Sequence, residues 1–220
     1  MIKSPVSIVV FVAATAAAQS ALAQGFGDTW YVSAFGGYSN IGSIDTNFAA
    51  DKVEHEFDDS YALGITVGKT VAPNLRAELE LSYSSYDGGN VTYDLSGFDF
   101  TTEGDADLTF LLANVWYDLP SVDLGGGAVP YVGAGIGAVR LHTDTFFNGF
   151  GSGYSDTVTA TAFQIGLGVQ LPINTGMLDI GYRFKAAQGF DIDNVAIGFG
   201  RFDDGDFNSN NLQVSYAIKS

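Results

Sequence analysis

Apolar and polar residues alternate along most of the chain with a period of two, a pattern typical of β-strands that present one face to an apolar environment. In LRAELELSYS, residues 75–84, leucine, alanine and tyrosine occupy the odd positions, whereas arginine, glutamate and serine occupy the even ones. The pattern predicts eight strands, because seven further segments alternate in a comparable way: 30–38, 61–68, 108–119, 129–141, 162–171, 178–186 and 212–219. After the N-terminal segment, no stretch reaches the roughly 18 consecutive apolar residues of a transmembrane helix.

The polarity of the two faces indicates which side of each strand lies inside. A soluble sandwich would bury the apolar face and leave the charged face in water, where glycine is not needed. In a membrane barrel the uncharged face contacts lipid, and the polar face with its glycines lines a narrow interior. We therefore expect an all-β fold, an eight-stranded antiparallel up-and-down transmembrane β-barrel. Segment 108–119 is apolar on both faces, and we place Asn114 and Asp118 inside.

Glycines on the inward face favour the barrel. Glycine weakens an ordinary strand, yet VPYVGAGIGAVRL, residues 129–141, carries one at every second position from 133 to 137. An eight-stranded barrel is only just wide enough for side chains to fill. We therefore expect small inward residues to make room for large ones. The small residues are Gly133, Gly135, Gly166 and Gly181, and the large ones are Tyr131, Arg76 and Arg183.

The connections between the predicted strands alternate in length. Long acidic connections are expected at 39–59, 87–106, 143–156 and 189–210. Short turns are expected at 70–74, 120–128 and 172–176. Long loops on one rim and short turns on the other are typical of bacterial outer-membrane barrels. The expected orientation has the long loops extracellular and both termini periplasmic, because the number of strands is even.

The N-terminal segment and the charge balance indicate an exported protein. Lys3 precedes the apolar run VSIVVFVAATAAA and the small-residue site at 21–23, which are the parts of a secretory signal peptide. We expect residues 1–23 to be cleaved and residues 24–220 to form the barrel domain. The mature chain then carries eight basic and 25 acidic residues, a formal charge of −17, which disfavours nucleic acid as a partner. The chain contains no cysteine and therefore no disulfide framework.

Several of these segments also carry a family resemblance. WYVSAFGGYS, NVWYDLP, VPYVGAGIGA, FQIGLGVQL and LDIGYRF are similar to successive strands of the small eight-stranded outer-membrane barrels of proteobacteria, related to the barrel domain of outer membrane protein A. The resemblance implies residence in the bacterial outer membrane, contact with its lipid and lipopolysaccharide, and insertion by the barrel-assembly machinery. No peptidoglycan-binding domain is expected after the last strand. The sequence ends in YAIKS rather than on the aromatic residue usual in the family.

The strongest polar cluster is predicted inside the barrel. Charges buried in a narrow interior are tolerated when they are paired and hydrogen-bonded, so we expect one network, with Arg183 or Arg76 as the partner of Glu80. It could serve as a structural plug or as a gate for ions. The six inward charges are Arg76, Glu78, Glu80, Asp179, Arg183 and Lys185. Aromatic girdle residues are expected at the membrane interfaces: Trp30, Tyr38, Tyr61, Tyr83 and Tyr117.

Enzymatic chemistry has weak support in the sequence. His142 and Asp144 share one face of a strand, but nothing fixes a nucleophile beside them. We expect no enzyme activity, no cofactor and no specific metal site, although the acidic loops could bind divalent cations weakly. The predicted function is a non-enzymatic structural or surface-interaction role. The main alternative is a narrow ion or small-solute channel gated by the interior charges, and the third is a lipid-modifying enzyme that uses His142.

Overall fold

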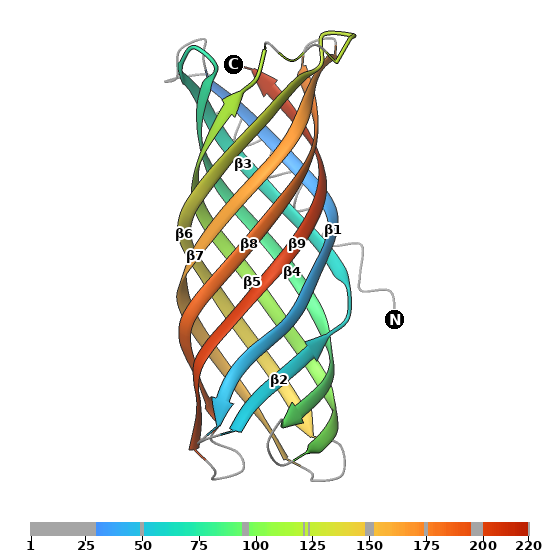
Figure 1. Cartoon of the computed structure of the whole chain (residues 1–220), viewed down its shortest axis with the longest axis vertical. Coiled ribbons are helices and arrows are strands. Elements are labelled where there is room, and N and C mark those ends of the chain that lie inside the picture. The colour runs from blue at the N-terminus through green and yellow to red at the C-terminus, as the bar shows by residue number, and fades with distance from the viewer. Residues whose placement is uncertain are drawn as a thin grey trace.

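The chain folds into a closed antiparallel β-barrel (Figure 1). The computed structural model describes residues 30–48, 51–93, 97–120, 122, 124–147, 152–173, 176–194 and 200–219. The predicted signal peptide, residues 1–23, lies outside the described residues. Nine strands lie within them: β1 (Trp30–Phe48), β2 (Asp51–Phe57), β3 (Ser60–Ala72), β4 (Leu75–Tyr93), β5 (Phe98–Asp118), β6 (Val129–Phe147), β7 (Ser152–Ile173), β8 (Gly176–Asn194) and β9 (Gly200–Lys219).

The nine strands make a wall that is eight strands wide. Each strand pairs with its neighbours in sequence order, and β1 pairs with β9 to close the ring. Both β2 and β3 lie between β1 and β4, one above the other, with residues 58–59 between them. They therefore fill a single position in the wall, and the predicted eight-stranded up-and-down barrel is confirmed. We call the end that carries β2 the β2 end and the opposite end, where β3 turns into β4, the turn end.

The outer face of the wall is apolar over the middle of the barrel, as the alternation predicts. In β5, Leu111 is 58% exposed on the outside, whereas the adjacent Leu112 is fully buried inside. This also confirms that Asn114, which is buried, lies inside. No helix in the described part of the chain is long and apolar enough to cross a membrane. The exposed apolar side chains on this face include Leu79, Leu81, Leu111, Val115, Ile136, Phe163, Ile165, Leu167, Ile180, Leu212 and Val214.

The prediction of long loops at the β2 end is wrong. The strands continue far into those segments: β1 runs to Phe48, β6 to Phe147 and β9 starts at Gly200. The period-two alternation also continues, but with inverted polarity, because here the apolar residues face inward. A wall that leaves the lipid meets water outside, so its apolar side chains are stabilised by turning into the interior, as in a soluble barrel. This β2-end core consists of Ile41, Ile44, Val53, Tyr86, Ala106, Leu108, Phe110, Leu112, Val139, Leu141, Ala162, Ala187, Phe190, Ile192 and Phe207.

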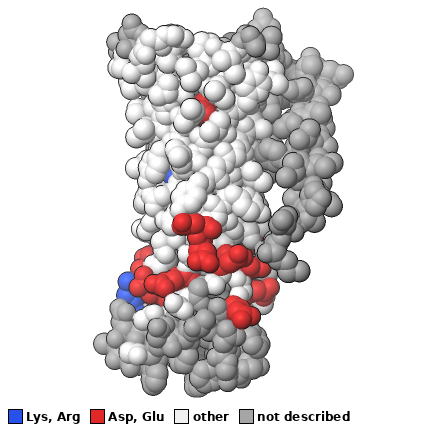
Figure 2. All heavy atoms as spheres, turned by 90° about the vertical axis from the view of Figure 1, so that its right-hand side faces the viewer, with Lys and Arg blue, Asp and Glu red and all other residues white. Residues whose placement is uncertain are grey.

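Acidic side chains cover the outside of the wall around this core. Figure 2 shows Asp and Glu gathered in a band toward the β2 end, below an almost uncharged surface. Register pairs three of them in one row across β9, β1 and β2, because Asp45 lies opposite both Asp206 and Glu54. Like charges in directly opposite positions destabilise a sheet. Partial burial raises the pKa of Asp206, and the negative charge of Asp45 raises it further.

Candidate functional site

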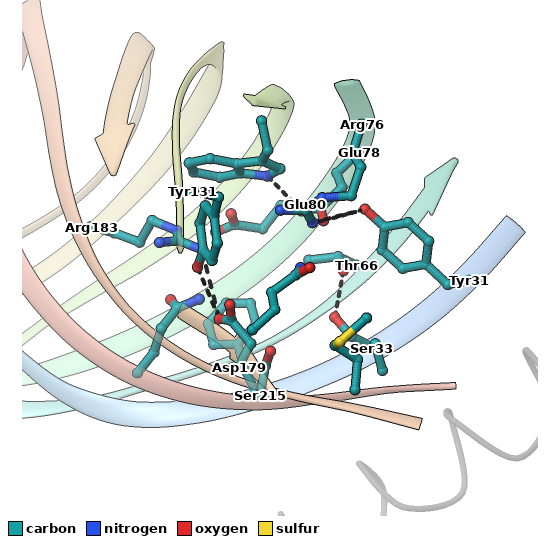
Figure 3. Close-up of a pocket in the computed structure, with 16 residues that line it drawn as sticks. Tyr31, Ser33, Thr66, Arg76, Glu78, Glu80, Tyr131, Asp179, Arg183 and Ser215 are labelled. Atoms are coloured by element: carbon teal, nitrogen blue, oxygen red, sulfur yellow. Dashed lines mark hydrogen bonds and ion pairs between the residues drawn. The ribbon is translucent and has the colours of Figure 1, made fainter. Parts of the chain in front are cut away.

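The charged lumen in the half of the barrel nearer the turn end is the densest polar site of the described chain, and it begins with a cluster around Glu78. The side chains of this cluster point toward one another from β1, β4 and β5 (Figure 3). The Glu78 carboxylate accepts hydrogen bonds from Tyr31 Oη at 2.5 Å, Trp116 Nε1 at 2.8 Å and Arg76 Nη1 at 3.1 Å. Arg76 also forms an ion pair of 3.0 Å with Asp118. The three donors Tyr31, Trp116 and Arg76 satisfy a carboxylate that is otherwise shielded from water.

A second cluster lies beside the first and is built around Arg183. Its guanidinium donates a 2.7 Å hydrogen bond to Tyr131 Oη, and that hydroxyl donates to Asp179 at 3.0 Å. The guanidinium carbon lies 4.2 Å from the ring centre of Trp116 and 5.2 Å from that of Tyr131. Arg76 stacks on Tyr131 at 5.1 Å. Tyr131 therefore joins the two clusters, since cations contact its ring while its hydroxyl bridges Arg183 and Asp179.

The third cluster, around Glu80, lies between these clusters and the β2-end core. Lys185 Nζ lies 2.6 Å from Glu80 Oε1, and both residues are only 2% exposed. Asn114 and Gln164 donate to Oε2 at 3.1 and 3.2 Å, and Ser82 donates to Oε1 at 2.8 Å. Lys185 also lies 4.6 Å from the centre of the Phe110 ring, which belongs to the β2-end core. The charged network therefore ends directly against apolar side chains.

All six predicted interior charges lie in the lumen, but their pairing differs from the prediction. Lys185, not Arg183 or Arg76, is the partner of Glu80. Glu80 on β4 and Lys185 on β8 are not neighbours in the wall, so their side chains meet across the lumen. Arg76 and Arg183 are instead held by the aromatic residues between them. Residue parity predicts which side chains enter a barrel but not which of them meet across it.

Sequence reasoning left the neutral and aromatic side chains out of this network, although it placed Tyr131 and Asn114 inside the barrel. Each of five such residues donates a hydrogen bond to one of its carboxylates: Tyr31, Trp116, Tyr131, Asn114 and Gln164. Trp116 and Asn114 share their parity with the inward Asp118 on β5, and Tyr131 and Gln164 share theirs with inward glycines of β6 and β7, which was the available signal. A fourth carboxylate, Asp118, was placed inside by sequence reasoning but was left out of the charge network.

The inward glycines receive the large side chains of the neighbouring strands. Register places Trp116 opposite Gly133, Asn114 opposite Gly135 and Arg183 opposite Gly166. A Cβ atom at any of these glycines would collide with the side chain or backbone across from it. The glycine stripe is therefore the complement of the network, because each missing side chain leaves the space that a neighbour fills. The same relation links Tyr31 with Gly68 on β3.

The remaining space in the lumen is small. A polar cavity of about 30 Å³ is lined by members of the Glu78 and Arg183 clusters, including Arg76, Glu78, Asp179 and Arg183. That volume suits roughly two water molecules. The Glu80 cluster and the β2-end core then occupy the section toward the β2 end. The arrangement holds the charged side chains in place and leaves no room for bulk water.

The other predicted residues lie on the outer wall. Tyr38, Tyr61, Tyr83 and Tyr117 are exposed, and Tyr38 and Tyr61 are direct cross-strand neighbours. Their contact with a membrane interface stays a prediction, as does that of Trp30.

The histidine candidate also lies on the outer wall. His142 Nε2 lies 3.7 Å from Asp144 Oδ2, and its Nδ1 lies 2.8 Å from Thr157 Oγ1. Among the described residues, no group of three or more His, Asp or Glu side chains is arranged to hold a metal ion.

The closed wall, its apolar outer band and its polar lumen define a transmembrane β-barrel. The chain belongs to the outer membrane protein β-barrel domain family, whose model matches residues 9–219. Its relatives are barrel proteins of the bacterial outer membrane.

Individual relatives are distant. A protein of Rickettsia bellii, whose name proposes that it is an adhesin, is 26% identical over 183 residues, 76% of this chain and 78% of its own length. Among solved structures, OprG from Pseudomonas aeruginosa is 15% identical with a TM-score of 0.55, covering 90% of this chain and 99% of its own. Neisserial surface protein A is 19% identical with a TM-score of 0.50, covering 87% and 97%. At these identities the two structures show the fold alone.

Proposed function

We propose that this protein is a non-enzymatic surface-interaction protein whose β2 end projects from the cell and binds a positively charged partner. The observation that carries the proposal is the β2 end itself, where strands continue past the apolar band around their own hydrophobic core and carry acidic residues outside. A projecting wall with a packed core is rigid, so little conformational entropy is lost when a partner binds to it. In this orientation both termini are periplasmic.

The charge distribution supports a basic partner. We define the acidic patch as Asp45, Glu54, Glu56, Asp204 and Asp206, all on β1, β2 or β9. Lys52 is the cation placed among them, and it lies 3.0 Å from Asp45. A concentrated single-sign field of this kind accelerates association with an oppositely charged surface and rejects like-charged ones. The adhesin name of the Rickettsia bellii relative is consistent with such a role.

The lumen supports a structural role for the interior charges. A solute would have to pass the dry Glu80–Lys185 pair and then the apolar β2-end core. Opening the first exposes a buried charge, and opening the second exposes hydrophobic side chains, so both steps are costly. We expect lipid, lipopolysaccharide and the barrel-assembly machinery to be the partners of the wall itself.

The orientation can be tested on intact cells. The chain has no cysteine, so Asp204→Cys at the β2 end and Asn74→Cys at the turn end each introduce a unique thiol. A membrane-impermeant maleimide should label Asp204→Cys on intact cells and Asn74→Cys only after lysis. The reverse labelling would contradict the proposal.

The surface role is tested by binding of the full chain in nanodiscs to immobilised poly-lysine and a panel of basic proteins. Neutralising four patch residues, by Glu54→Gln, Glu56→Gln, Asp204→Asn and Asp206→Asn, should weaken binding at least tenfold. The matched control neutralises four acidic residues on other strands: Asp87, Glu103, Asp144 and Asp156. Equal losses in both variants would show that net charge alone acts, and the acidic patch would not be the binding surface.

A further inference from the structure

One carboxylate oxygen in the lumen cavity accepts no hydrogen bond. Asp179 on β8 lines this cavity and is only 6% exposed (Figure 3). Its Oδ1 atom accepts from Tyr131, whereas its buried Oδ2 atom accepts no hydrogen bond from the described residues. Leaving a buried carboxylate oxygen without a partner is costly, so this atom marks a place where a ligand is expected.

The charges around the cavity do not balance. Arg76 is shared between Glu78 and Asp118, and Arg183 Nη2 lies 4.0 Å from Asp179 Oδ1 while it donates to Tyr131 instead. One negative charge is therefore left over, and the pairing is loosest at Asp179. The network has four carboxylates and three cations among the described side chains: Glu78, Glu80, Asp118, Asp179, Arg76, Arg183 and Lys185.

The uncompensated charge selects the kind of ligand. A water molecule would donate a hydrogen bond to Asp179 Oδ2 but would leave the excess charge in a narrow lumen with little solvent. Calcium and magnesium need six or more oxygen ligands, usually with more than one carboxylate, and they would overcompensate a single charge. A monovalent cation balances the charge and needs only one carboxylate beside neutral oxygens.

The cavity offers neutral oxygen ligands next to this carboxylate. Ser215 lies directly opposite Asp179 on the neighbouring strand β9. The hydroxyls of Ser33 and Thr66 lie 2.6 Å apart and line the same cavity. Each hydroxyl oxygen has two lone pairs, so one that takes part in a hydrogen bond can still bind a cation. The volume of about 30 Å³ accommodates a small ion with one water but not a bulky organic cation.

A cation can reach this cavity from the turn end. Met177 and Ala217 also line it, and they form the register pair next to Gly176, the first residue of β8. An ion that enters there does not pass the Glu80 cluster or the β2-end core. The site is therefore compatible with a lumen that is closed to transport.

We infer that the half of the lumen nearer the turn end binds one small monovalent cation, of the size of sodium, at Asp179 Oδ2. Ser215 supplies a second oxygen ligand, and the remaining ligands are other hydroxyls of the cavity and one water. The cation completes the charge balance of the interior network and holds the Asp179 carboxylate in place beside Tyr131. The inference depends neither on the orientation of the barrel in the membrane nor on the acidic patch.

Urea unfolding of the full chain from lipid vesicles tests the site. Sodium chloride is compared with choline chloride at the same concentration, because choline preserves the ionic strength but is too large for the cavity. A dissociation constant of about 20 mM would make the unfolding equilibrium constant about sixfold lower in about 100 mM sodium. Asp179→Asn should abolish this difference, and Ser215→Ala should reduce it. Asp87→Asn, which neutralises an exposed carboxylate of the outer wall, should retain it in full.

Sodium NMR relaxation of the protein in detergent micelles gives a direct readout of binding. The wild type and Asp87→Asn should broaden the sodium resonance more than Asp179→Asn does, and heat-modifiable gel mobility confirms that each variant is folded. Equal sodium effects in the wild type and Asp179→Asn would overturn the inference.

Two rival sources of positive charge are a proton on Asp179 and the ammonium group of Lys219, the last residue of β9. Absence of a sodium effect on the wild type from about pH 6 to about pH 9, across which a free carboxyl is ionised, would favour the proton and overturn the inference. A sodium effect that appears only in Lys219→Gln would assign the balancing charge to Lys219 and would also overturn it. Sodium stabilisation of the wild type that persists in Lys219→Gln and is lost in Asp179→Asn would support the site.

Discussion

Removing the Glu80 carboxylate should be among the most destabilising single changes in the lumen. Glu80 accepts hydrogen bonds from Lys185, Ser82, Asn114 and Gln164, so Glu80→Ala removes the acceptor of four donors at once. Lys185 would retain a 2.9 Å hydrogen bond to Ser82 and its position near an aromatic ring. Neither of these two contacts neutralises the charge of Lys185.

The magnitude follows from burial. Breaking one side of a buried ion pair typically costs about 3 to 5 kcal/mol, because the remaining charge is left uncompensated. With both residues at 2% exposure, solvent screening does not reduce this figure. Lys185→Met should cost less, since Ser82, Asn114 and Gln164 would still donate to the carboxylate. The double variant leaves no unpaired charge, so its cost should fall clearly below the sum of the two single costs.

Urea unfolding of the full chain from lipid vesicles, followed by gel mobility, measures these free energies. The reasoning would be refuted if Glu80→Ala cost less than about 1 kcal/mol, or if the two single costs added within about 0.5 kcal/mol, which is the behaviour of independent sites. Planar-bilayer recordings supply a second readout. A plug predicts no conductance from the wild type, whereas regulated conductance that rises in Glu80→Ala would favour a gate.

Three further predictions concern the wall and the β2-end core. Leu79→Arg, in the middle of the apolar band, should cost roughly 2 to 4 kcal/mol in vesicles, while Asp87→Arg on the same strand should cost less than about 1 kcal/mol. Leu108→Ala should cost about 2 to 5 kcal/mol, because that residue is fully buried in the β2-end core, and an unchanged urea midpoint would contradict this core. Burial lowers the pKa of His55 from 6.5 to about 4, against the opposing charge of Asp45. The contribution of His55 to the free energy of unfolding should therefore be constant above pH 6.5. It should fall by about 3 kcal/mol as the pH drops toward 4, because only the unfolded chain takes up the proton. His55→Asn should remove this pH dependence.

The strand segments could be predicted because lipid and a narrow lumen impose a strict alternation. Each lipid-facing position must be apolar, so Leu79, Ile165 and Val214 are easily distinguished from their polar neighbours in the sequence. The strand extensions escaped prediction because the rule reverses at the membrane boundary. Ile41 and Phe207 are apolar residues of an inner face, and acidic residues lie between such positions on the outer one. A strand pattern that keeps the apolar residues on the outer face along its whole length does not match these stretches, so they are predicted to be irregular acidic loops.

The sequence predicts which charged side chains point into the lumen, because residue parity decides this. It does not predict which of them contact one another, because these contacts depend on the shape of the closed barrel. Arg183 illustrates this. Its neighbours on the wall are Gly166 and Asn211, yet its guanidinium stacks on Trp116 from β5. The glycine opposite it leaves room for the side chain to leave its own strand and cross the lumen.

The two halves of the lumen exclude water by different means, and this difference bears on function. In the half nearer the turn end, each charge is held by partners that would have to be replaced one by one if the side chain moved. In the β2-end half, apolar side chains pack without such directional bonds. A conducting state would need both halves to open together, because opening either one alone leaves the other closed. The outer surfaces can engage a partner without breaking either half, so binding there leaves the stability of the barrel intact.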